Sequence, residues 1–313
     1  MQIFYTSVSI FVRGLALLLL SLSISAAARE PELKNVAPRT VERPLSLAIL
    51  DFGNAAPGRL AADKLAINLK RESGLIVLDR DQVRAAARGA GYESSLSLTL
   101  GEARDLGAAL GSDFFILGDA QTLRRSPSDG PVYFDSYASI FVVSARTGRL
   151  LSWQRPAFAA DTPAAAEQLL LSELSGLEIQ HRLSVTVHRA QDDERGEREL
   201  TTAEQIPIIE AAPDDEKSAG AEGLRLPRPY RRFVPAYPES AARAEVEATV
   251  DVLVDLDATG EVTRVEVVRW AGFGLDEATV ETVRRLHFFP AMRDGIAIPI
   301  RVLLRYNFRK PPK

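Results

Sequence analysis

The sequence contains no cysteine. This absence excludes disulfides, thiolate zinc sites, iron–sulfur ligation, a cysteine nucleophile and a lipidated cysteine. Histidine is scarce as well, with only His181, His188 and His287. No two of them stand at the i,i+3 or i,i+4 spacing that brings histidine ligands together on a helix. We therefore predict no metal site and no cofactor.

An excess of positive charge is also missing. The chain has 38 Lys and Arg residues against 42 Asp and Glu residues, a net charge of −4. This balance excludes a generally basic nucleic-acid-binding surface, so no nucleic-acid partner is predicted. The 313 residues are 46% hydrophobic, which is enough to bury cores. At roughly 100–200 residues per domain, the length suggests about two domains.

Long hydrophobic runs are absent except at the N-terminus. Residues 1–28 carry Arg13, then the apolar run Leu15–Leu22, and end in Ala26-Ala27-Ala28. A short apolar core with small residues before the cleavage point predicts a secretory signal peptide cut after Ala28. The alternative is an uncleaved membrane anchor over residues 3–28, since a span needs about 20 apolar residues. That anchor would bury Arg13 at a cost of about 2.5–3.5 kcal/mol. In both cases the remainder is exported.

Residues 29–44 are polar and predicted to be a flexible lead-in, and residues 45–190 are predicted to form an α/β domain of sandwich type. Buried-type apolar runs alternate there with segments of helical spacing. Thr99 and Glu102 form a capping-box pattern before one of the helices, and Asp81 is predicted as the N-cap of another. The expected strands are 45–50, 75–78, 114–118, 132–143, 150–153 and 179–189; the expected helices are 58–72, 83–88, 100–110 and 164–174.

Residues 191–235 are predicted to be a disordered linker. The stretch 191–222 holds 11 acidic and three basic residues and few large apolar ones. Such a composition cannot bury enough apolar surface to offset the entropy of ordering. Residues 223–235 then become basic and proline-containing, which is typical of a solvated lead-in to the next domain.

The C-terminal residues show the clearest pattern. Residues 248–256 alternate between apolar and polar side chains, and residues 261–268 return after the turn sequence Asp257–Gly260. Period two on both sides of a turn predicts a β-hairpin. Helical spacing follows over 275–286, and a last alternating strand is predicted over 298–308. The order is strand, strand, helix, strand (ββαβ), so the whole chain is predicted to be α+β.

Several short motifs accompany this order. They are Ala236-Tyr237-Pro238-Glu239-Ser240-Ala241, the turn ending at Gly260, Gly274-Leu275-Asp276-Glu277-Ala278, Arg284-Arg285-Leu286-His287-Phe288-Phe289-Pro290-Ala291 and Arg293-Asp294-Gly295-Ile296-Ala297-Ile298-Pro299-Ile300. Together they resemble the C-terminal domain of TonB, the energy transducer of the Gram-negative envelope. The resemblance covers residues 236–308, and it predicts a TonB-like domain over 236–313.

The resemblance implies a periplasmic domain that binds the TonB box, a short peptide segment of outer-membrane transporters. Binding by strand addition agrees with the physics, because a terminal strand with exposed N–H and C=O groups is a template for another strand. The resemblance places partner binding on the last strand and on the segment around Tyr237 and Pro238 that leads into the domain, here called the approach segment. The predicted partner-binding residues are Tyr237, Pro238, Ile298, Ile300, Arg301, Leu303 and Arg305. Two simpler roles stay open: Arg301 and Arg305 as solvated edge charges, and Tyr237 as an aromatic that covers the core.

The chain departs from a typical TonB transducer in three ways. Its N-terminal run reads as cleavable, its linker lacks a proline-rich rod, and a folded domain stands where the rod should be. The predicted partner is an outer-membrane TonB-dependent transporter or a similar envelope protein, with inner-membrane motor proteins added if the chain is anchored. The choice between a monomer and a strand-exchanged homodimer stays open.

The N-terminal domain has a weaker likeness of its own. Its motifs are Leu47-Ala48-Ile49-Leu50-Asp51-Phe52, Val77-Leu78-Asp79-Arg80, Gly107 to Gly118 and Thr147-Gly148-Arg149-Leu150-Leu151. They are similar to periplasmic domains such as those of the curli secretion protein CsgG and the N-terminal domain of TolB, although the chain lacks the cysteine on which CsgG carries its lipid. This resemblance implies an alternative function as a non-catalytic envelope-assembly or scaffolding factor.

Signatures of catalysis are missing. The chain has no G-x-G-x-x-G, no G-K-[ST] loop and no G-x-S-x-G elbow. Asp51 and Asp79 follow predicted strands, a position that can hold catalytic carboxylates of a hydrolase. Ion pairing and helix capping are the favoured roles for such residues. We therefore predict that the protein is not an enzyme and has no catalytic residues.

Overall fold

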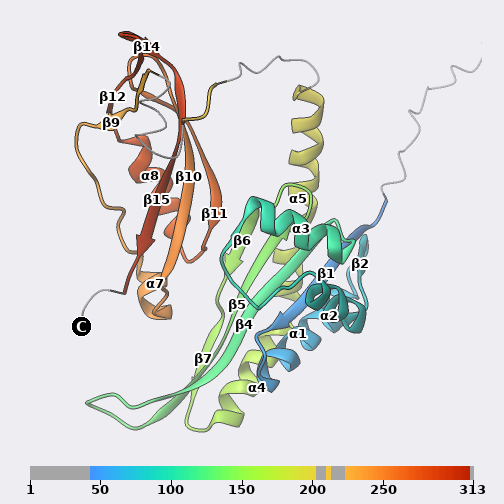
Figure 1. Cartoon of the computed structure of the whole chain (residues 1–313). Helices are drawn as coiled ribbons and strands as arrows, with labels where there is room; N and C mark the ends of the chain where they lie inside the picture. Colours follow the sequence, from blue (N-terminus) through green and yellow to red (C-terminus); the bar gives the residue numbers. More distant parts are fainter. Residues whose placement is uncertain (1–42, 202–208, 213–222, 311–313) are drawn as a thin grey trace, which may run out of the picture. The chain divides into compact units, whose positions relative to one another are not determined.

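The computed structural model describes residues 43–201, 209–212 and 223–310 (Figure 1). The described residues belong to one compact unit. The predicted signal segment 1–28 and nearly all of the lead-in 29–44 lie outside the described residues. No helix in the described part of the chain is both long and apolar enough to cross a membrane.

The N-terminal half is built on a mixed sheet in which β1 and its two neighbours run parallel and the later strands run antiparallel. The order is β2-β1-β4-β5-β6, and β7 pairs with β5 beyond the end of β6. The strands are β1 (Leu45–Phe52), β2 (Leu75–Val77), β4 (Phe114–Arg125), β5 (Tyr133–Ser144), β6 (Leu150–Gln154) and β7 (Ala157–Ala160).

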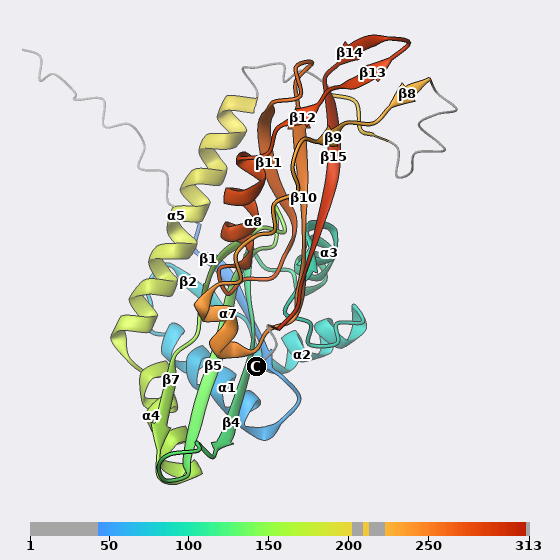
Figure 2. The same ribbon diagram turned by 90° about the vertical axis from the view of Figure 1, so that its left-hand side faces the viewer.

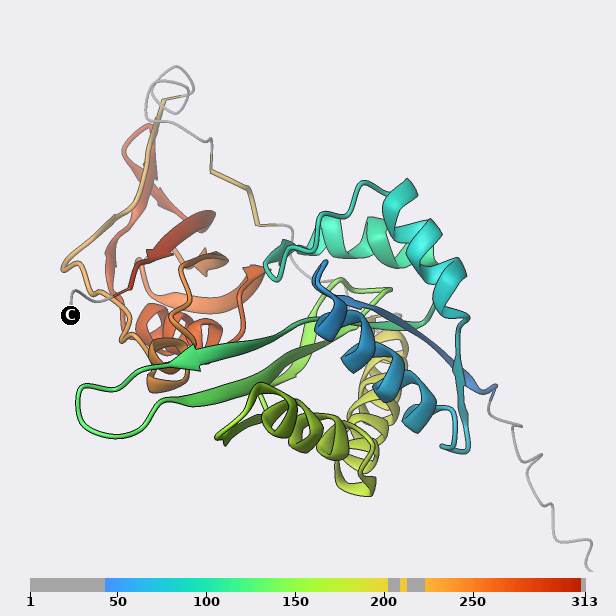
Figure 3. The ribbon, with the colours of Figure 1, turned by 90° about the horizontal axis from the view of Figure 1, so that it is seen from below.

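Helices cover both faces of this sheet (Figure 3). One face packs with α1 (Ala56–Leu69), α4 (Pro163–Leu174) and α5 (Leu177–Thr201). The other face packs with α2 (Arg80–Gly89) and α3 (Leu100–Leu110). Alternate residues of each central strand enter opposite cores, which is why the strands read as continuous apolar runs in the sequence.

Local capping explains where two of these helices begin. Thr99 caps α3 and forms the predicted capping box, with its Oγ1 accepting from the Glu102 N–H and the Glu102 carboxylate accepting from the Thr99 N–H. The prediction that Asp81 caps the next helix is wrong. Asp79 is the N-cap of α2 and accepts from the N–H groups of Asp81 and Gln82, because the helix starts at Arg80, three residues before the start that its apolar spacing indicated.

The prediction of a strand at 179–189 is wrong as well, and so is the start of the predicted linker at residue 191. This stretch is the long helix α5 (Leu177–Thr201), which includes the first part of the acidic run. Ile179, Leu183, Val187 and Ala190 recur at helical spacing and are buried against the sheet. That apolar stripe stabilises the helix despite its charged continuation. Residues 202–208 and 213–222 of the predicted linker lie outside the described residues.

The C-terminal half is a second sheet, with the order β15-β10-β11-β3. The predicted hairpin is confirmed, because β10 (Ala248–Leu256) and β11 (Val262–Trp270) are antiparallel. The helix α8 (Leu275–Arg284) packs on the face that holds Val252 and Val254 of β10 beside Val267 and Val265 of β11. Smaller pieces flank them (Figure 2). These are β3 (Leu98–Thr99), β8 (Leu224–Arg225), β9 (Arg228–Pro229), α7 (Glu239–Ala244), β12 (Phe288–Phe289), β13 (Ala291–Arg293) and β14 (Ile296–Ile298). The remaining strand of the sheet, β15 (Ile300–Phe308), is as long as β10 and β11.

The last strand begins later than the sequence pattern indicated. The prediction placed Ile298 and Ile300 on one strand, but Pro299 divides them. Ile298 ends β14, which pairs with β13, and Ile300 begins β15, which pairs with β10. Proline has no N–H to contribute to a ladder, so the change from one sheet to the other falls at this residue.

Aromatic contacts join residues of the two halves within the compact unit. Trp270 at the end of β11 is 2% exposed, stacks on Phe141 of β5 and donates its Nε1–H to the Gly148 carbonyl at 3.0 Å. Phe273 contacts the rings of both Phe141 and Trp153. The short strand β3 continues the C-terminal sheet through Leu98 and Thr99. A single apolar cluster therefore includes buried residues from both halves.

Candidate functional site: the outer edge of β15

The candidate site is the side of β15 that faces away from β10, here called the outer edge. β15 is the terminal strand of its sheet, and its other side pairs with β10 over the full length from Ile300–Leu256 to Phe308–Ala248. A terminal strand presents a row of N–H and C=O groups that a further strand can pair with. The predicted C-terminal strand therefore lies at the end of its sheet, with one side paired with β10 and the other turned away from it.

The register identifies which backbone groups point outward. Arg301 donates its N–H to the Glu210 carbonyl and accepts from the Ala212 N–H, both away from β10. Backbone groups of successive residues in a strand point to alternate sides, so those of Leu303, Arg305 and Asn307 point outward as well. Within the described parts of the chain, backbone bonds reach the outer edge only at Arg301.

Two arginines of β15 form cross-strand pairs with aspartates of β10. Arg301 binds Asp255 through Nε–Oδ1 at 2.5 Å and Nη2–Oδ2 at 2.8 Å, and Arg305 binds Asp251 in the same way at 2.7 and 2.9 Å. Hydrogen bonding to these carboxylates raises the pKa of both guanidinium groups above the ordinary arginine value. The aspartate side chains are only 5% exposed. These ion pairs link β15 to β10 across the ladder and neutralise the arginine charges.

The other predicted residues of the strand separate into distinct positions. Leu303 is 49% exposed on the same face as the two arginines, whereas Ile300 is fully buried in the core. Ile298 lies on β14, in the small sheet with β13 and β8. The structure thus brings the side chains of Arg301, Leu303 and Arg305 together on one face of β15. Ile298 and Ile300 do not lie on that face.

Tyr237 and Pro238 lie at the start of α7. The Tyr237 hydroxyl donates to the Val246 carbonyl at 2.6 Å, and its ring is 6.4 Å from that of Phe308 at the end of β15. Burial raises the pKa of Tyr237. Pro238 is the N-cap residue of α7. Tyr237 thereby ties the approach segment to the terminus of β15, as expected of an aromatic that covers the core.

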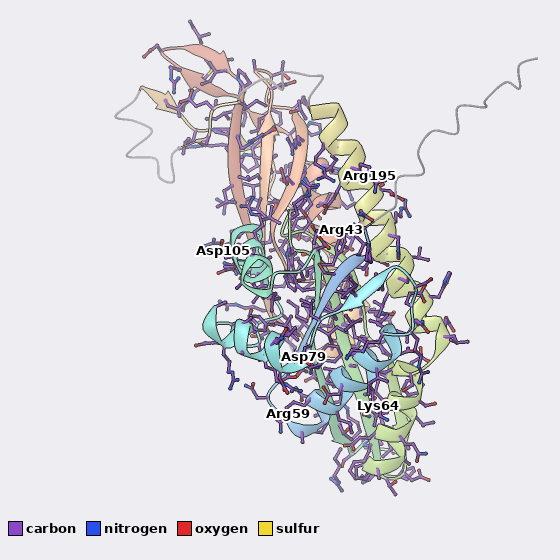
Figure 4. The ribbon with its side chains drawn as sticks, turned by 90° about the vertical axis from the view of Figure 1, so that its right-hand side faces the viewer. Arg43, Arg59, Lys64, Asp79, Asp105 and Arg195 are labelled. Atoms are coloured by element: carbon purple, nitrogen blue, oxygen red, sulfur yellow. The ribbon has the colours of Figure 1, made fainter. Side chains whose placement is uncertain are left out.

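The aspartates considered for hydrolysis have structural partners. Asp51, at the end of β1, forms ion pairs with Arg80 and Arg84 of α2. Asp79 caps α2 (Figure 4). Asp51 lines a pocket of about 540 Å³ to which Asp79 does not contribute. Among the described residues, no group of three or more acidic or histidine side chains is placed to hold a metal ion.

Sequence reasoning missed three features of the edge. It did not pair Asp251 and Asp255 with the β15 arginines, although all four fall on the polar positions of alternating strands. It did not assign any role to Arg293. It also treated residues 209–212 as part of a spacer, although Ile208-Ile209 interrupts the acidic composition and was the available signal.

Comparison with known families agrees with this geometry. Residues 234–309 match the family model described as the C-terminal domain of the Gram-negative bacterial TonB protein. The predicted TonB C-terminal domain is therefore confirmed for this quarter of the chain, and the protein carries a domain of Gram-negative envelope proteins. No curated protein shows significant sequence similarity to the chain.

Solved structures resemble parts of the chain at low identity. The C-terminal domain of Pseudomonas aeruginosa TonB has 19% identity and a TM-score of 0.25, over 28% of this chain and 89% of that one. Lipoprotein GNA1162 from Neisseria meningitidis has 15% identity and a TM-score of 0.32, over 44% and 99%. The C-terminal domain of LpoB from Salmonella enterica has 14% identity and a TM-score of 0.27, over 37% and 82%. Scores this low carry no conclusion about function.

Proposed function

We propose that the outer edge of β15 binds an extended segment of an outer-membrane protein by strand addition, in support of TonB-type transport. The observation that carries this proposal is the row of outward backbone groups at Leu303, Arg305 and Asn307 on a terminal strand. Main-chain hydrogen bonds supply affinity in this mode of recognition. The match to the TonB C-terminal family supports the choice of an envelope partner.

A backbone test distinguishes strand addition from ordinary side-chain contact. Leu303→Pro removes an N–H that points away from β10, so it leaves the ladder with β10 intact. Leu303→Ala is the matched control, because it removes the side chain and keeps the N–H. The probes are labelled synthetic peptides with the N-terminal segments of TonB-dependent outer-membrane transporters, and the readout is fluorescence anisotropy with the purified full-length chain.

Strand addition predicts that the Leu303→Pro variant loses at least tenfold in peptide affinity. One lost backbone bond accounts for part of this loss, and the proline ring also hinders the approach of a partner strand. The Leu303→Ala variant should bind within about threefold of the wild type. Equal binding by the two variants, or no binding of any transporter peptide to the wild type, would overturn the proposal.

Export to the periplasm and the absence of catalysis are parts of the same proposal. N-terminal sequencing of the protein from its native envelope tests the first part. A start near Arg29 in the soluble fraction favours a periplasmic adaptor. A start at Met1 in the inner-membrane fraction favours an anchored transducer that can work with inner-membrane motor proteins.

A second candidate function is that of a non-catalytic envelope-assembly or scaffolding factor that acts through the N-terminal half. The observation that favours it is the size of that half: a six-stranded sheet with helices on both faces, larger than the TonB-like part. Deletion of residues 236–313 would also uncover Phe141, so a point variant is the cleaner test. A Leu303→Pro variant that keeps full function in cells would favour this candidate.

A further inference from the structure

Part of the chain itself already lies on the outer edge of β15. Residues 209–212, here called the linker strand, run parallel to β15 and place Ala211 opposite Arg301. The Arg301 N–H donates to the Glu210 carbonyl at 2.8 Å, and the Ala212 N–H donates to the Arg301 carbonyl at 2.7 Å. These two bonds have the geometry with which a parallel β-strand joins a sheet.

Side chains hold the linker strand in the same register. The Glu210 carboxylate accepts two hydrogen bonds from the Arg293 guanidinium of β13, at 2.7 and 2.8 Å. These bonds lower the pKa of Glu210, so the group is ionised at neutral pH. Ala212 packs on the apolar core of the C-terminal half. Backbone, charge and apolar contact therefore select one position for this segment.

We propose that the linker strand is a resident occupant of the peptide-binding edge, and that an outer-membrane segment binds by displacing it. This inference rests on the proposed function, since it concerns the same edge. Two strands cannot pair with the same outward groups of Arg301 at once. Because the linker strand is covalently tethered, it competes at a high effective concentration without a second molecule. The linker strand thus keeps the unpaired backbone groups of Arg301 from pairing with other chains until a partner binds.

The occupant covers only one end of the edge. Its hydrogen bonds stop at Arg301, while the outward groups of Leu303, Arg305 and Asn307 continue along β15. Within the described parts of the chain no backbone bond reaches these outward groups, so an incoming segment can pair there first and then replace the linker strand at Arg301. Such stepwise exchange needs no unfolding of β15, whose other side stays paired with β10.

A pair of proline variants isolates the contact. Ala212→Pro removes the N–H that binds the Arg301 carbonyl. Ala211→Pro is the matched control, because the residue opposite Arg301 in a parallel pair points its own N–H away from β15. Glu210→Gln is an independent variant that keeps the backbone bonds and weakens the ion pair with Arg293. Glu210 and Ala211 are exposed, and Ala212, which packs on the core, is replaced by another apolar residue.

The first readout is amide hydrogen exchange of Arg301 in the full-length chain, measured by NMR without any partner. The Arg301 amide should exchange about 2- to 10-fold faster in Ala212→Pro than in wild type, the range expected for the loss of one net hydrogen bond. Glu210→Gln should also accelerate exchange, and Ala211→Pro should not. Equal exchange rates of the Arg301 amide in the wild type, Ala212→Pro and Glu210→Gln proteins would contradict the proposal that the linker strand occupies the outer edge.

The second readout is affinity for the labelled transporter peptides. Release of the edge should raise affinity about 2- to 10-fold in Ala212→Pro, because apparent affinity scales with the open fraction. Unchanged affinity despite faster Arg301 exchange would overturn displacement. If no peptide binds any variant while exchange changes as expected, the proposed function fails and the resident strand stands.

Discussion

Arg301 and Asp255 face each other across β15 and β10 and share two hydrogen bonds, with the aspartate almost completely shielded from water. The arginine is therefore a structural part of the strand whose backbone bears the candidate site. Its guanidinium binds Asp255 of the neighbouring strand, and its N–H and C=O form hydrogen bonds at the outer edge. Side chain and backbone of one residue thus have separate roles.

We predict that Arg301→Ala lowers the free energy of unfolding by about 1–3 kcal/mol, because a shielded carboxylate loses its partner. Urea denaturation of the full-length chain measures this. Leu303→Ala, an exposed change on the same strand, is the control and should cost less than about 0.5 kcal/mol. Equal losses in the two variants would show that the pair with Asp255 contributes little.

We predict that Asp276 makes stability fall as the pH rises from about 4 to about 6. Burial raises the pKa of this carboxyl to about 6, above its ordinary value, although it accepts from the N–H groups of Ala271 and Gly272. The folded state therefore binds more protons than the unfolded state in this range, and ionisation at higher pH is unfavourable only in the folded state.

The measurement is urea denaturation of the wild type and Asp276→Asn between pH 4 and pH 7. The difference in unfolding free energy, wild type minus variant, should fall across this window, by at most about 1.4 kcal/mol per pH unit. Glu281→Gln, an exposed change on the same helix, should leave the pH profile of the wild type unchanged. A flat difference would contradict a raised pKa at Asp276.

We predict that Gly272→Ala weakens the contact between the two halves. Its φ is +71°, and a Cβ there would collide with the Phe141 ring. Overpacking of this kind typically costs about 1–3 kcal/mol, in addition to the strain of a positive φ.

Gly295→Ala is the matched control, because Gly295 also has a positive φ but a Cβ there meets no atom within 4 Å. Thermal unfolding of both variants separates the strain from the collision. Gly272→Ala should lower stability more than Gly295→Ala and broaden or split the transition. Identical behaviour of the two would argue against tight packing of Phe141 on the Gly272 turn.

We predict that Asp79 acts as a helix cap that serine can replace. Asp79→Ala should lower the free energy of unfolding by about 0.5–2 kcal/mol, the usual cost of losing an N-cap acceptor. Asp79→Ser should retain most of that stability, because its hydroxyl can accept from the same N–H groups. Chemical denaturation of both variants tests this, and an equally large loss in Asp79→Ser would point to a role that needs the carboxylate itself.

Local pattern predicted much of the fold. The alternation in residues 248–256, the turn at Gly260 and the helical stripe from Leu275 specify the ββαβ order, because period and turn chemistry are properties of neighbouring residues. The Thr99–Glu102 capping box is equally local. The helix at 177–201 was misread because Val185, Thr186 and Val187 suit a strand by propensity. The helical spacing of Ile179, Leu183 and Val187 determines instead which face is buried.

The amino-acid sequence by itself determined most of the longer strands, the TonB-like motifs and the polar positions that hold Arg301 and Arg305. Only the tertiary structure decided which strand is terminal, that Asp255 lies opposite Arg301, that Trp270 reaches the Gly148 carbonyl, and that residues 209–212 occupy the outer edge. The physical reason is that backbone pairing joins any two extended segments. Its partners are therefore chosen by the packing of the whole unit, and residues far apart in the chain meet without any periodic signal between them.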